Sequence, residues 1–149
     1  MKKFHFTLEK LKDFRGQELD RQKNALSALQ AELRRINDSA EQLRAKVVEQ
    51  SVQLELVCSS GAMASDIAMR KRYIVTLQQE IHLKEQQAVM KQQEIEKQLD
   101  IVVEATKDVK TLEKLEEKQL EEYKALETKE NEQFIEEFVS GQTVRAGTH

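Results

Sequence analysis

A long heptad pattern of apolar residues, interrupted at one place only, is the feature of this sequence that most restricts its fold. In the first half, positions from Leu26 to Val57 follow alternating three- and four-residue spacing, and only Gln50 among them is polar. In the second half, apolar residues recur every seventh position from Ile67 to Val109. This spacing places the apolar side chains of each half in one stripe along an α-helix, as in coiled coils.

The two stripes differ in polarity. The first consists of Leu26, Leu29, Leu33, Ile36, Ala40, Leu43, Val47, Gln50, Leu54 and Val57. The second has an apolar column, Ile67, Ile74, Ile81, Ala88, Ile95, Val102 and Val109, and a more polar one, Arg70, Leu77, Lys84, Lys91, Gln98, Ala105 and Leu112. Long Lys and Arg stems can cover the edges of such a seam while their charges stay in water. We therefore expect a seam of modest stability per turn.

The break between the stripes predicts a hairpin. Residues 59–65 are small and include Gly61, which can adopt the left-handed conformation that ends a helix. The pattern predicts a helix over about 7–58, a longer helix over about 66–138 and a disordered tail over 140–149. Because a short turn closes at low entropic cost, we expect an all-α, single-domain antiparallel coiled-coil hairpin that is a monomer when isolated.

The position of the turn also predicts the register. If the turn is centred near Ala62, facing residue numbers sum to roughly 124, which places Leu43 near Ile81 and Leu8 near Glu116.

The second helix is expected to extend beyond the first. Its unpaired part, from Glu117 to Phe138, would be about 33 Å long at 1.5 Å per residue. It ends in the apolar residues Phe134, Ile135 and Phe138, which have no partner helix in the predicted hairpin.

Composition excludes several functional classes. The formal net charge of −3, with 34% charged residues mixed along the chain, is not the footprint of a nucleic-acid-binding protein. The longest β-branched apolar run, Ile101–Val103, is far too short to span a membrane, and polar residues over 7–13 interrupt any signal peptide. The single cysteine, Cys58, agrees with a reducing compartment. We expect a cytoplasmic protein without direct membrane insertion.

Nothing in the sequence predicts catalysis. It has no Gly-rich phosphate loop and no nucleophile with an activating base, and two helices enclose no cavity that excludes water. His5, His82 and His149 lack the spacing of metal ligands. We therefore expect no enzymatic activity, no cofactor and no metal.

Three segments resemble the flagellar FliJ family. They are Lys3–Leu11 followed by Arg15, Arg72–Leu77 after the turn, and Ala105–Leu115. The resemblance extends from Phe4 to about Phe138. It implies a component of the flagellar type III export apparatus, held at the inner face of the cell membrane and similar in shape to the central stalk of rotary ATPases. Implied partners are the hexameric export ATPase, the membrane export gate protein and empty export chaperones.

The resemblance also implies a contact site for the gate protein. Tyr73 and Leu77 fall where the family presents an aromatic residue and a leucine to that partner. The heptad spacing places Leu77 in the seam as well, so the sequence leaves both roles of this leucine open.

Basic residues are candidate contacts for the ATPase. They are Arg15, Lys110, Lys114 and Lys118. The alternative for the three lysines is a solvated surface paired with glutamates at i,i+3 spacing.

A cytoplasmic coiled-coil scaffold or chaperone unrelated to flagella is the main alternative function. A prefoldin-like chaperone would add β-hairpin signals, meaning alternating apolar runs with turn dipeptides, and this sequence contains none.

Overall fold

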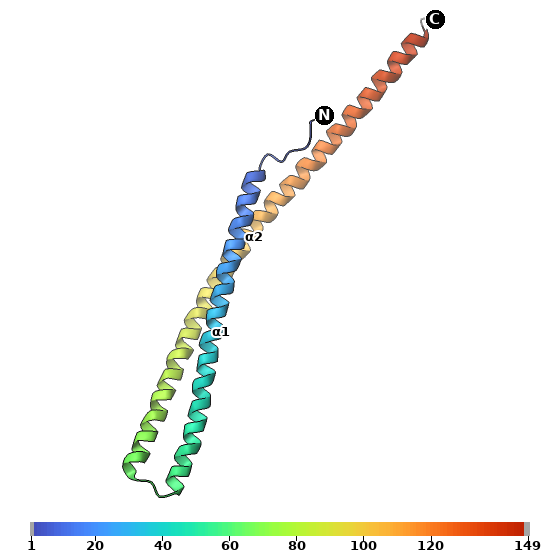
Figure 1. Cartoon of the computed structure of the whole chain (residues 1–149). Helices are drawn as coiled ribbons and strands as arrows, with labels where there is room; N and C mark the ends of the chain where they lie inside the picture. Colours follow the sequence, from blue (N-terminus) through green and yellow to red (C-terminus); the bar gives the residue numbers. More distant parts are fainter. Residues whose placement is uncertain (1, 148–149) are drawn as a thin grey trace. The chain divides into compact units, whose positions relative to one another are not determined.

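The computed structural model describes residues 2–147 and contains two helices, α1 (Glu9–Ser59) and α2 (Ala64–Gly147). A short turn joins them (Figure 1). No strand occurs in the described residues, and the contacts between α1 and α2 are those of a helical hairpin with a longer second helix. The predicted fold class is confirmed.

The turn is tighter than predicted and depends on one glycine. It comprises residues 60–63, and Gly61 has a φ of +79°. Ser60 and Ala62 donate backbone hydrogen bonds to the carbonyls of Leu56 and Val57, which closes the end of α1. A Cβ at position 61 would strain this left-handed backbone, so Gly61 performs the predicted role.

The end of α2 differs from the expectation of a disordered tail. The helix continues through residues 140–147 and ends at Gly147. No proline interrupts the backbone there, and a glycine such as Gly141 costs only about 1 kcal/mol relative to Ala, which does not stop a helix already formed. The part of the predicted tail at Thr148 and His149 lies outside the described residues.

The chain packs as two compact units, which we describe one at a time. The hairpin unit comprises Arg21–Val102 and contains the turn. The terminal unit comprises Met1–Asp20 and Val103–His149.

The seam of the hairpin unit lies where the heptads place it. Every predicted position on both helices is buried or half-buried, and Ala40, Leu77 and Ile95 are the most enclosed. Two helices in contact leave each seam residue partly open on its flanks. The core is therefore a single line of side chains. If one of them is shortened, no second layer of core residues is present to fill the cavity.

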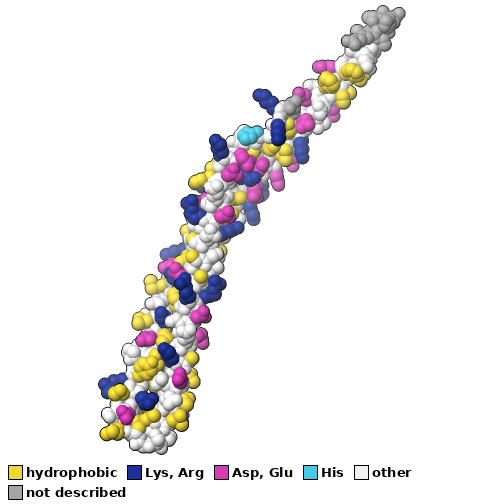
Figure 2. Space-filling model, viewed as in Figure 1, with side chains coloured by type: hydrophobic (Ala, Val, Ile, Leu, Met, Phe, Trp, Pro, Cys, Tyr) yellow, Lys and Arg dark blue, Asp and Glu magenta, His cyan; other side chains and the backbone are white. Residues whose placement is uncertain are grey.

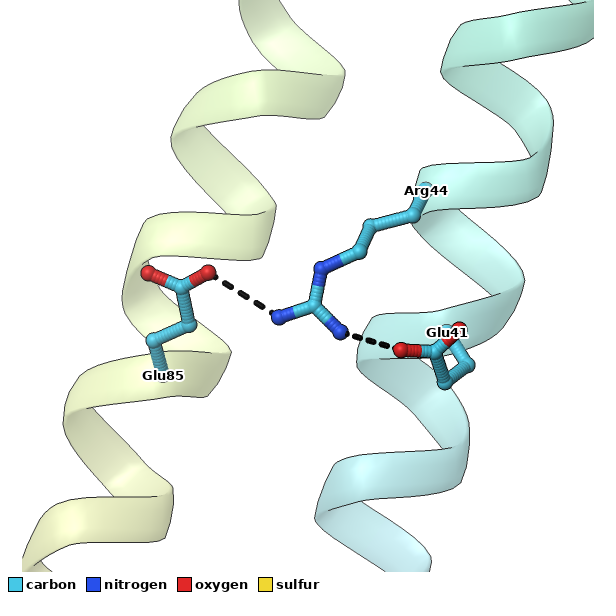
Figure 3. A network of polar contacts seen from close by, with 3 residues as sticks. All are labelled: Glu41, Arg44 and Glu85. Atoms are coloured by element: carbon cyan, nitrogen blue, oxygen red, sulfur yellow. Dashed lines mark hydrogen bonds and ion pairs between the residues drawn. The ribbon is translucent and has the colours of Figure 1, made fainter.

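Ion pairs along the seam fix the register of the hairpin unit. The Arg44 guanidinium donates to Glu85 of α2 at 3.0 Å and to Glu41 of its own helix at 2.6 Å (Figure 3). These contacts lie close to the predicted neighbours Leu43 and Ile81, so they support that register.

Two further contacts cross the seam at its polar positions. The Lys91 ammonium lies 2.7 Å from Glu32 and 2.9 Å from Glu94. Gln98 Nε2 donates to the backbone carbonyl and the side-chain oxygen of Gln22, at 3.0 and 2.7 Å. The hydrogen bond from Lys91 lowers the pKa of the Glu32 carboxyl from its ordinary value. The stabilisation from this pair is therefore present at neutral pH and is lost as the pH falls through the lowered pKa.

In the terminal unit, the residues before α1 pack against α2. Phe6 is only 2% exposed, the Phe4 ring lies 5.5 Å from the Tyr123 ring, and the Tyr123 hydroxyl donates to the Lys2 carbonyl. Lys12 forms an ion pair with Glu116. Contacts from the amino-terminal part of the chain therefore reach Tyr123, farther along α2 than the predicted start of the overhang at Glu117.

The polar contacts of the terminal unit lie within about one turn of the expected register, as the Arg44–Glu85 pair does in the hairpin unit. Glu116 pairs with Lys12, one turn beyond Leu8, and Thr7 lies within hydrogen-bond distance of Gln119.

We predict that this hairpin forms within one chain in solution. Spin labels at Glu41 and Glu85, placed in a Cys58→Ser background, should report a short distance that dilution does not change, because both residues flank Arg44. The control pair Glu41 and Glu55 lies on one helix and should give about 21 Å at 1.5 Å per residue. A 41–85 distance that lengthens on dilution would indicate pairing between chains and contradict the hairpin.

Candidate protein-binding surfaces

The structure separates the two residues expected at the gate-binding site. Leu77 is 3% exposed and packs in the seam, whereas Tyr73 is 45% exposed on the flank of α2. Leu77 therefore presents no free side chain to a partner while the hairpin is closed. Its place in the seam holds the segment that carries Tyr73.

The outward face of α2 beside Tyr73 carries no charge over several turns. Its side chains are all exposed, and they are Val75, Thr76, Gln79, His82, Leu83, Gln86, Val89, Met90 and Gln93. In a chain with 34% charged residues such a face is unusual. Hydrophobic side chains are visible on the surface of this unit close to the turn (Figure 2). We refer to these nine residues as the neutral face.

The neutral face is not smooth. A groove at its edge is lined by His82, Gln86, Val89 and Met90 of the neutral face and by Glu85, which borders that face. Gln86 Nε2 and His82 Nε2 lie 3.2 Å apart, within hydrogen-bond distance.

Met90 also lines a second groove, which lies between the helices. Its α1 side is formed by Glu32, Arg35 and Ile36, and its α2 side by Gln87, Met90, Lys91 and Glu94. Flexible methionine side chains adapt to differently shaped apolar partners, so these grooves suit protein binding better than recognition of a small polar ligand.

Sequence reasoning missed the neutral face. The signal was present, since Val75, His82 and Val89 recur every seven residues and Thr76, Leu83 and Met90 follow them directly. These positions lie opposite the seam, so the heptad pattern that defines the seam does not include them.

The four basic residues expected to contact the ATPase, which are Arg15, Lys110, Lys114 and Lys118, are exposed. Arg15 lies 5.8 Å from the centre of the Phe14 ring, at cation–π distance. Lys110, Lys114 and Lys118 are four residues apart, so they line one face of α2. Within the described part of the chain, none of these three lysines forms an ion pair, so the expected pairing with neighbouring glutamates is not observed.

Beyond Tyr123, the described side chains of α2 are exposed on all sides. Phe134 is 70% exposed, and Ile135 and Phe138 are each 59% exposed. Large apolar side chains at this exposure, within one stretch of helix, mark a surface that another molecule can cover.

Neither a metal centre nor a membrane span is found in residues 2–147. No group of three or more His, Cys, Asp or Glu in this range is placed to hold a metal ion. None of the described helices combines the length and the apolar character needed to cross a membrane.

Comparison with known proteins identifies one relationship. A family model described as flagellar FliJ protein matches residues 4–148. No curated protein and no solved structure matches the chain.

Proposed function

The chain belongs to the flagellar FliJ family and is a flagellar export component, and on that basis we propose that it is a stalk and chaperone escort that binds the export ATPase ring and the membrane export gate. The match of the family model to nearly the whole chain is the observation that carries this proposal. It also disfavours a scaffold or chaperone unrelated to flagella.

The terminal unit supplies the surface for the ATPase. Lys110, Lys114 and Lys118 offer three unpaired cations on one helix face, and Phe134 and Phe138 offer apolar contact area. Cations of this kind attract an acidic partner, and buried aromatic residues contribute most of the affinity at protein interfaces. Arg15 adds a positive charge, and its guanidinium lies over the Phe14 ring.

The hairpin unit supplies the surface for the gate protein. Tyr73 is the exposed aromatic anchor, and the neutral face extends the contact along α2. Leu77 acts indirectly, by holding this segment of α2 against α1. The chain also binds empty export chaperones and escorts them.

The chain acts without catalysing a reaction. Its contacts with the ATPase and the gate keep it at the cytoplasmic face of the membrane, with no insertion into the lipid. No nucleotide, cofactor or metal takes part in its own function.

The lysine face gives the test of the ATPase contact. Reversing three exposed charges with Lys110→Glu, Lys114→Glu and Lys118→Glu should weaken binding to the purified ATPase by a factor between about three and a hundred, because each exposed charge contact contributes about 0.2–1 kcal/mol. Affinity for the gate protein should not change. Both affinities can be measured by biolayer interferometry with the full chain immobilised.

A matched variant controls for net charge. Reversing the exposed residues Lys23, Lys46 and Lys71 in the hairpin unit changes the total charge equally and should leave ATPase binding within about twofold. Equal losses in both triple variants would show that net charge, and not the lysine face, determines binding.

A further inference from the structure

The outer face of the last turns of α1 carries an apolar ridge with an acidic border. Val48, Val52 and Leu56 follow one another at four-residue spacing and are 64, 51 and 59% exposed. They lie away from the seam, which runs through Val47 and Leu54. A row at i, i+4 and i+8 forms a ridge of the kind that packs into a groove on another helix, in the commonest class of helix crossing.

Two glutamates border this ridge on opposite sides of its centre. Glu49 and Glu55 are each three residues from Val52, and both are exposed. Neither carboxylate has an ion-pair partner among residues 2–147. Lys46 lies three residues before Glu49 but forms no ion pair with it in the described part of the chain, and from Val47 to Ser59 the helix contains no Lys or Arg.

From this arrangement we infer that Val48, Val52 and Leu56 dock a basic amphipathic α-helix of a protein partner. The apolar face of that helix would cover the ridge, and its Lys or Arg residues would pair with Glu49 and Glu55. This surface is on α1 and is separate from Tyr73, from the neutral face and from the terminal unit, so the inference does not depend on the proposed contacts with the gate or the ATPase.

Charge disfavours the other occupants of an exposed apolar ridge. A second copy packed symmetrically on this face would bring Glu49 and Glu55 towards the same residues of its partner, and like charges in contact oppose association. An anionic membrane surface would be repelled by the same carboxylates. A basic helix satisfies both the apolar and the acidic parts of the surface.

A pair of model peptides tests the inference with the full chain. One is a Leu/Lys amphipathic helix of about 14 residues, or roughly four turns, and the other has Glu in place of every Lys. Fluorescence anisotropy should detect saturable binding of the Leu/Lys peptide that weakens as salt is raised, and no binding of the Leu/Glu peptide. Absence of binding by the Leu/Lys peptide, or equal binding of both peptides, would overturn the inference.

Matched variants locate the site. The set Val48→Ser, Val52→Ser and Leu56→Ser, and separately the pair Glu49→Gln and Glu55→Gln, should each weaken binding by about tenfold or more. The α2 set Met69→Ser, Leu99→Ser and Ile101→Ser, which are 65, 49 and 47% exposed, and the pair Glu80→Gln and Glu96→Gln make equivalent changes elsewhere and should leave affinity within about twofold.

Three outcomes would contradict the assignment to α1. Equal weakening by the α2 variants would mean that the peptide binds the acidic chain without a defined site. Retained affinity in both α1 variants would place the site elsewhere. Sedimentation of the wild-type chain, but not of the α1 variants, with phosphatidylserine vesicles would assign the ridge to a membrane. The Glu→Gln pair keeps the ridge intact, so the test holds even if the serine variants unfold.

Discussion

Leu77→Ala should lower the free energy of unfolding by about 2–5 kcal/mol, the range for removing a buried leucine. Leu77 is 3% exposed in a seam one side chain deep. No second layer of the core can fill the space that the substitution leaves. Urea denaturation monitored by circular dichroism measures the loss directly.

The companion substitution, Tyr73→Ala, separates an effect on stability from an effect on binding. Tyr73→Ala removes a side chain that is 45% exposed, so it should change the free energy of unfolding by no more than about 0.5 kcal/mol while weakening gate-protein affinity by about tenfold. The opposite pattern, with Leu77→Ala neutral for unfolding and Tyr73→Ala neutral for gate binding, would mean that Leu77 is the contact residue and that Tyr73 is not.

The seam could be predicted from the sequence because its signal is periodic. The ten heptad positions from Leu26 to Val57 all contribute to one stripe, and the apolar residues that recur every seventh position on α2 form the facing stripe. The turn could also be predicted, because Gly61 is the one glycine in a cluster of small residues between the two apolar patterns.

The packing before α1 could not be predicted in the same way. The segment 2–6 is not helical and has no period, so nothing in it indicated that Phe4 would meet Tyr123 or that Phe6 would be buried. Aromatic side chains can bury large areas from irregular backbone, and such contacts depend on three-dimensional proximity alone.

The role of Leu77 was undecided for a different reason. Its heptad position indicated the seam, whereas the family resemblance indicated a contact with the gate, and only the burial of the side chain distinguishes them. The lysines of α2 were ambiguous because an i,i+3 ion pair contributes only a few tenths of a kcal/mol, too little for sequence to decide whether it forms.

The second large effect is expected on the export ATPase. We predict that the chain alone hydrolyses no ATP and that its addition raises turnover by the ATPase. A protein that binds the assembled hexamer more tightly than its free subunits shifts the equilibrium towards the hexamer by mass action. Charge reversal at Lys110, Lys114 and Lys118 should reduce this stimulation, and reversal at Lys23, Lys46 and Lys71 should not.

Steady-state ATP turnover by the purified ATPase, titrated with the full chain, tests the central claim most directly. If the chain is a non-catalytic stalk of the export apparatus, turnover rises to a plateau, and the chain without the ATPase stays at the background rate. Turnover that remains unchanged up to a saturating concentration of the chain, or hydrolysis by the chain alone, would contradict it.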